Sequence, residues 1–151
     1  MRLLPLLAVL LLVGCSSVSE RWAEAHFYDI SYPSLYGVVV TTVDAEGFAV
    51  RSRDPQTAEI HSDWVYGTSM RVVRGPSRRR VHAELVPQGE DAYLVRLRVE
   101  EQVVRKGGML ATNVRESENW EEFDDNYDDA EYLMAKIAAL LQAHRARAAT
   151  P

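Results

Sequence analysis

The strongest constraint on the fold is a regular alternation of apolar and polar residues over most of two neighbouring segments, residues 79–86 and 93–103. Successive side chains of a β-strand point to opposite faces, so this pattern predicts two strands with one buried and one solvated face. The intervening residues 88–91 contain glycine and acidic residues that are typical of a turn. We therefore expect a long antiparallel hairpin. Its buried positions are Val81, Ala83, Leu85, Tyr93, Val95, Leu97 and Val99.

A second hairpin is predicted upstream. Residues 48–52 and 58–65 have the composition of short strands, and Asp54-Pro55-Gln56-Thr57 between them is typical of a turn.

The segment from Tyr32-Pro33-Ser34 to Gly47 has conflicting signals. Its β-branched run over residues 38–42 favours a strand. Proline in the first turn, glycine at the end and helical spacing of the apolar residues favour a helix. We follow the spacing, which is set by Leu35, Val38, Val39 and Val43.

Residues 128–147 predict a longer helix, with acidic residues in the first turn and basic residues in the last, as the helix dipole favours. Its apolar stripe consists of Tyr132, Leu133, Ile137, Leu140 and Leu141. The element order is then helix, four strands, helix. This order predicts an α+β fold in which two helices cover one face of a four-stranded antiparallel sheet.

The run from Tyr32 to Val65 resembles the repeat unit of the C lipoprotein of the outer-membrane β-barrel assembly machine: a helix ending in Gly-Phe, a strand, an Asp-containing turn and a strand closing on Asp-Trp. The residues that carry the resemblance are Gly47, Phe48, Asp54, Ile60, Asp63 and Trp64. It implies a helix-grip fold and association with other envelope proteins, and it transfers no catalytic residue.

The amino-terminal end predicts export. Met1 and Arg2 precede an apolar run over residues 3–13, which is shorter than the roughly 20 residues that a membrane-spanning helix needs. The run ends in Leu12-Val13-Gly14-Cys15, and Cys15 is the single cysteine of the chain. These four residues resemble the lipobox of bacterial lipoproteins.

The lipobox resemblance implies cleavage between Gly14 and Cys15, a diacylglycerol on the Cys15 thiol and an acylated amino group. Two or more acyl chains anchor a protein stably to a membrane. Ser16 and Ser17 follow Cys15, and no aspartate stands next to it. In enteric-type lipoproteins this pattern directs the protein to the outer membrane, facing the periplasm. We expect a signal peptide over residues 1–14, a lipidated tether over 15–29 of about 50 Å reach, one α+β domain over 30–147 and a tail over 148–151.

The charge of the chain argues against nucleic acid as a partner. Removal of residues 1–14 takes away one arginine, so the mature chain would have 16 basic and 22 acidic side chains, a net charge of −6. Arginines nevertheless gather around Gly75-Pro76, at Arg71, Arg74, Arg78, Arg79 and Arg80. We predict an interaction surface from Arg78, Arg79, Arg80, Trp120 and Phe123. Tyr66 would join Trp120 and Phe123 in a contact patch if all three are exposed.

Two histidines each have a carboxylate two residues away, as His61 with Asp63 and His82 with Glu84. On a strand each pair would share one face, so the pairs could supply metal ligands if they faced each other. Solvated polar positions of a half-buried sheet explain the same pattern.

The stretch over residues 116–131 contains nine carboxylates and no basic residue. Asp124, Asn126 and Asp128 match the first ligands of a calcium loop, but Asp129 and Ala135 stand where that loop needs glycine and glutamate. A solvated loop and helix start is the simpler interpretation, and weak binding of a cation or a basic partner is the alternative.

The sequence contains no motif of a hydrolase, a zinc protease or a phosphate-binding loop, and we expect neither enzymatic activity nor a cofactor. The prediction is a lipid-anchored protein that acts by binding an envelope protein, as an accessory to outer-membrane assembly or maintenance. One alternative is an envelope metal-binding protein or enzyme that uses the two His-x-acid pairs. The other is a structural tether between membrane and wall.

Overall fold

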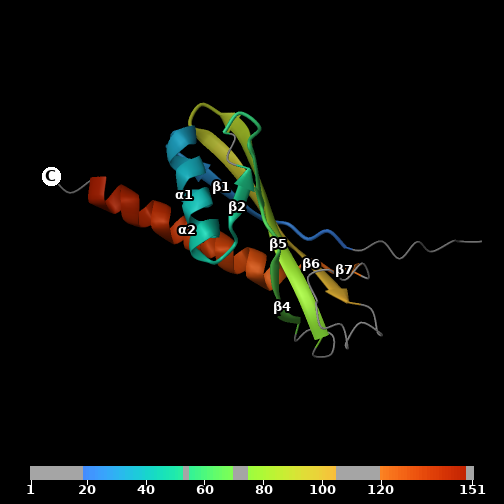
Figure 1. The fold of residues 1–151 in the computed structure, drawn as a ribbon. Coiled ribbons are helices and arrows are strands. Elements are labelled where there is room, and N and C mark those ends of the chain that lie inside the picture. Colours follow the sequence, from blue (N-terminus) through green and yellow to red (C-terminus); the bar gives the residue numbers. More distant parts are fainter. Residues whose placement is uncertain (1–18, 53–54, 70–74, 105–119, 149–151) are drawn as a thin grey trace, which may run out of the picture.

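The computed structural model describes residues 19–52, 55–69, 75–104 and 120–148, which fold into seven strands and two helices around one sheet (Figure 1). The elements are β1 (Ala23–Tyr28), α1 (Tyr32–Ala45), β2 (Val50–Ser52), β3 (Glu59–Ser62), β4 (Val65–Ser69), β5 (Gly75–Gly89), β6 (Ala92–Val104), β7 (Trp120–Phe123) and α2 (Tyr127–Ala148).

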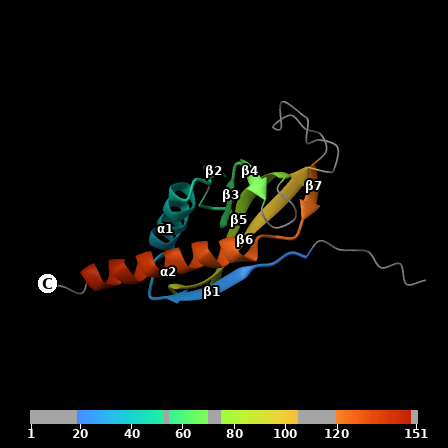
Figure 2. The same ribbon diagram turned by 90° about the horizontal axis from the view of Figure 1, so that it is seen from below.

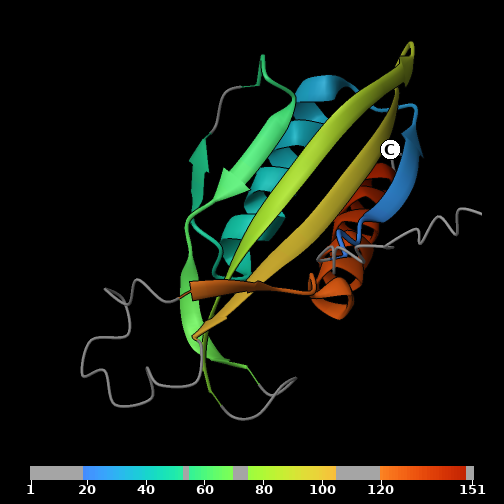
Figure 3. The same cartoon turned by 90° about the vertical axis from the view of Figure 1, so that its right-hand side faces the viewer.

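The predicted long hairpin forms the centre of the antiparallel sheet. Strands β5 and β6 pair over nearly their whole length, and the sheet order is β1-β6-β5-β3-β2. Strands β4 and β7 add to β5 and β6 at the end of the hairpin away from its turn, where Ser77 pairs with Val103 (Figure 3). We call this part of the molecule the β4–β7 end.

Both helices lie on the same face of the sheet (Figure 2). The alternating apolar residues from Val81 to Leu85 and from Val95 to Val99 point toward them and are completely or almost completely buried, whereas Tyr93 is only partly buried. They pack against buried residues of the helices, which are Leu35, Val39 and Val43 of α1 and Leu133, Ile137 and Leu141 of α2. The α+β class, the antiparallel sheet and its two helices are thus confirmed.

The helix predicted from Tyr32 is also confirmed, against the strand propensity of its β-branched run. Ser31 precedes it, Pro33 lies in its first turn, and Gly47 has a φ of 87° just after its end. The hydroxyl of Thr42 donates a hydrogen bond of 2.7 Å to the carbonyl of Val38 inside the helix. Tertiary burial of the apolar stripe outweighs the small propensity cost of these residues.

The prediction of four strands was wrong, because the sheet has seven. Residues 23–28, expected in the tether, form β1 and pair with β6, so the fold begins before residue 30. The strand expected over residues 58–65 is interrupted at Asp63-Trp64, which separates β3 from β4, and β7 was not predicted at all. Each added strand has only four to six residues, so its own alternation is too short to identify it.

Several predicted features lie outside the described residues. They are residues 1–18 with the lipobox, Asp54 of the predicted turn, and Arg71 and Arg74. Neither described helix is long and apolar enough to cross a membrane.

Two leucines of α2 test the core. Leu133 is 1% exposed and Leu140 is 48% exposed. We expect Leu133→Ala to lower the free energy of unfolding by about 2–5 kcal/mol, because it leaves a cavity against the sheet. The matched Leu140→Ala should change it by less than about 0.5 kcal/mol. Urea unfolding followed by circular dichroism measures both, and equal effects would contradict the placement of α2.

Candidate functional site

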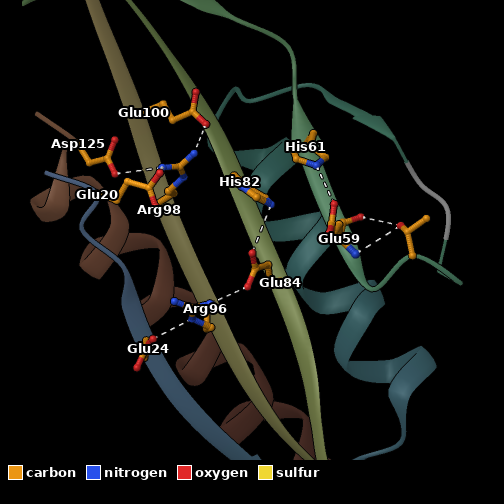
Figure 4. Close-up of polar contacts among 11 residues, drawn as sticks. Glu20, Glu24, Glu59, His61, His82, Glu84, Arg96, Arg98, Glu100 and Asp125 are labelled. Carbon is orange, nitrogen blue, oxygen red and sulfur yellow. Dashed lines mark hydrogen bonds and ion pairs between the residues drawn. The ribbon is translucent and has the colours of Figure 1, made fainter. Parts of the chain in front are cut away.

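Neither described helix covers the other face of the sheet, which we call the open face (Figure 3). It carries several of the predicted site residues, among them His61, His82 and Glu84 (Figure 4). The same alternation that buries Val81 and Leu85 directs Arg80, His82 and Glu84 to this open face. On the neighbouring strand β6 their register partners are Glu100, Arg98 and Arg96. The open face therefore consists of polar cross-strand neighbours of alternating charge.

The two arginines of β6 are bound by carboxylates. Arg96 contacts Glu24 at 2.9 Å and Glu84 at 3.0 Å. Arg98 contacts Glu100, Glu20 and Asp125 at 2.8, 3.1 and 3.8 Å. Both guanidinium groups also lie over the ring of Trp22, at 4.6 and 5.2 Å from its centroid.

The structure brings His61 and His82 together as direct register partners on β3 and β5. Their ring centroids are 4.2 Å apart and the rings are nearly parallel, at 27°. The Nε2 atom of His61 lies 3.3 Å from Oε2 of Glu59, and Nε2 of His82 lies 3.8 Å from Oε1 of Glu84. Among the described residues these groups form a compact imidazole–carboxylate cluster, which we call the histidine cluster (Glu59, His61, His82, Glu84).

The predicted grouping of His61, Asp63, His82 and Glu84 as metal ligands is corrected at both carboxylates, because the ligand atoms that lie together are those of Glu59, His61 and His82. Asp63 lies beyond the end of β3, and its carboxylate is 3.7 Å from the guanidinium of Arg51. Glu59 takes its place beside His61. The signal for Glu59 is present in the sequence, because it precedes His61 by two residues on the same strand and therefore shares its face.

Burial lowers the pKa of His82 below its usual 6.5, and the neighbouring His61 lowers it further. Glu84 and Glu59 oppose this shift and Arg98 reinforces it. The Nε2 atom of His82 is buried and has no hydrogen-bond partner among the residues that the structure describes. The neutral imidazole is thus the favoured form of this side chain.

At the β4–β7 end the open face carries a second cluster, which we call the arginine–tryptophan surface (Trp64, Tyr66, Arg78, Arg80, Trp120). The guanidinium of Arg78 lies over the rings of both Trp64 and Trp120, at 4.5 and 4.6 Å from the centroids. Arg80 lies over Trp64 at 4.6 Å, and the Tyr66 and Trp120 rings are 6.0 Å apart. The indole nitrogen of Trp120 is buried and has no acceptor within the described part of the chain.

The predicted interaction surface is therefore only partly assembled. Arg78, Arg80 and Trp120 meet on the open face, whereas Arg79 points to the helix side and forms an ion pair with Asp129 of α2. Phe123 pairs in register with Glu101, whose side chain is buried on the helix side, so Phe123 also leaves the surface. Neighbouring residues of a strand face opposite ways, so three consecutive arginines could not share one face.

The carboxylates of Asp124, Asp125 and Asp129 bind the chain itself. Asp125 is buried and accepts a hydrogen bond of 2.9 Å from the backbone N–H of Arg21, and burial raises its pKa. Asp124 accepts one of 3.5 Å from the N–H of Ser19. Asn126 and Asp129 exchange hydrogen bonds of 3.1 and 3.3 Å at the start of α2. These contacts fix the beginning of β1 and of α2.

A hollow of about 560 Å³ lies away from both clusters. It is formed between α1 and the last turns of α2 and includes Ile30, Val38, Leu140 and His144 in its lining. It contains no residue of the predicted sites. We therefore place the candidate functional site on the open sheet face.

No model of a known protein family matches the chain, and no curated protein sequence is significantly similar to it.

The lowered pKa of His82 makes stability depend on pH. Below pH 6.5 the unfolded chain binds a proton at His82 more readily than the folded chain, so the free energy of unfolding should fall as the pH drops from 6.5 toward the lowered folded value. Urea unfolding at several pH values in chelator-containing buffer measures this dependence. His82→Gln should reduce this fall in the free energy of unfolding, whereas the exposed control His26→Gln should retain it. A loss unchanged by His82→Gln would contradict the assignment.

Proposed function

We propose that the chain is a lipid-anchored bacterial cell-envelope lipoprotein that acts by binding, with an accessory role in outer-membrane assembly or maintenance. The lipobox residues support the anchor, and the resemblance to the assembly-machine lipoprotein supports the role. The single observation that carries the binding function is the arginine–tryptophan surface on the open face of the sheet.

The position of the first described residues supports placing the arginine–tryptophan surface close to the membrane. Ser19, Glu20 and Arg21 are held beside β7 and the start of α2 by contacts with Asp124, Arg98 and Asp125. The described chain thus begins near the β4–β7 end (Figure 1). Three residues lie between Cys15 and Ser19, so the two Cα atoms are four residue steps and at most about 14 Å apart. With Cys15 in the bilayer, the β4–β7 end would face the membrane surface.

The composition of the surface suits a partner at the membrane. Tryptophan, tyrosine and arginine are enriched where protein interfaces are buried, and aromatic side chains with one polar atom also suit the headgroup region. We favour an envelope protein as the partner, with the lipid headgroups as the surroundings.

The anchor is tested by intact-mass measurement of the protein from a host with a lipoprotein pathway. We expect a mature chain that begins at Cys15 and carries a diacylglycerol and an additional acyl chain. Cys15→Ser should remove both the modification and the cleavage, while Ser16→Ala should retain them. An unmodified Cys15 in the wild-type protein would overturn the anchor.

The binding surface is tested with a photoreactive amino acid at Tyr66 or at Tyr132, which are both exposed and lie on opposite sides of the molecule. We expect protein crosslinks from position 66 that are lost in Arg78→Ala, and few from position 132. Mass spectrometry separates protein from lipid adducts. Equal protein crosslinking from both positions, or lipid adducts alone from position 66, would contradict a protein partner at this surface.

A further inference from the structure

The histidine cluster is separate from the arginine–tryptophan surface and has a different chemistry. Its four residues form a two-by-two array on the open face, because Glu59 pairs in register with Glu84 and His61 with His82. The ligand atoms of Glu59, His61 and His82 all lie within 4.8 Å of one another. Two adjacent strands of a stable sheet therefore hold three donor groups together.

We propose that Glu59, His61 and His82 bind a divalent transition-metal ion such as zinc. Two imidazole nitrogens and one carboxylate oxygen are a donor set that suits zinc and its first-row neighbours. Three protein ligands leave a fourth coordination position for water. The inference rests on the geometry of the sheet and does not depend on the lipid anchor.

The surroundings of the cluster favour a cation. The carboxylate of Glu84 lies 3.8 Å from Nε2 of His82 and is held by Arg96, so it adds negative charge next to the proposed ligand atom. The two nearby arginines, Arg96 and Arg98, are both engaged by carboxylates. The negative charge of Glu59 is thus available to the metal ion together with two imidazoles.

The burial of His82 supports the same role. Its Nε2 atom is shielded from solvent and lacks a hydrogen-bond partner among the described residues, an arrangement that costs free energy unless a ligand satisfies the nitrogen. The rings of Trp22 and His82 make an edge-on contact, with 5.2 Å between centroids and an angle of 65° between the rings. Trp22 thus limits the rotation of His82 and places an indole next to the proposed ion.

The proposal is tested by calorimetric titration of zinc into the untagged full chain, purified in detergent and stripped with a chelator. We expect one ion per chain. His61→Ala and His82→Ala should each weaken binding by at least about tenfold, the loss that even outer-shell partners cause. Glu59→Gln should weaken it in the same direction. His26→Ala, which removes an exposed histidine of β1 outside the cluster, is the matched control and should bind as the wild type does.

A second readout comes from the tryptophan next to the cluster. Copper(II) should quench the fluorescence of the wild-type chain at one equivalent, and this step should be lost in His82→Ala and reduced in Trp22→Phe. Thermal melts without metal check that each variant is folded, and His61→Asn and His82→Gln replace any alanine variant that is not. Absence of saturable zinc binding, or binding that withstands the His61 and His82 substitutions, would overturn the site.

Discussion

The pairing of β5 with β6 is the interaction on which the rest of the structure depends. Its register aligns Val81 with Val99 and Ala83 with Leu97, which builds the apolar face that the helices cover. The same register aligns His82 with Arg98 on the other face. A shift by one residue would exchange the two faces, exposing the core and burying charged groups, so the hydrophobic effect enforces the register. The core and the candidate site both result from the register of β5 and β6.

The length of each periodic segment determines how much of the fold can be predicted from the sequence. The long hairpin and both helices contain enough repeats to identify them, even where Val38 to Thr42 favours a strand. Strands β1, β4 and β7 contain too few repeats to be identified, because each has only a few residues. Strand β1 also pairs with a strand about 70 residues away. Alternation also assigns Arg79 to the helix side and Glu59 to the open face. The sequence does not show which strands are neighbours. The pairing of β3 with β5 brings His61 next to His82.

The open face combines two environments on one strand. Arg80 belongs to the arginine–tryptophan surface, and His82, two residues later on the same face of β5, belongs to the histidine cluster. The two arginines of the neighbouring strand β6 are paired with carboxylates from the start of the described chain, from β5 and β6, and from the segment before α2. Charge compensation inside this face explains how so many ionic groups lie side by side without mutual repulsion.

The attachment of the chain start to the sheet has a mechanical consequence. Ser19 and Arg21 are held by carboxylates next to α2, and the chain then enters the six register pairs between β1 and β6. Tension applied at the amino-terminal end acts along β1, so these hydrogen bonds are loaded in shear and resist together instead of opening one after another. A protein anchored at this end could therefore resist pulling forces while the open face of its sheet remains folded.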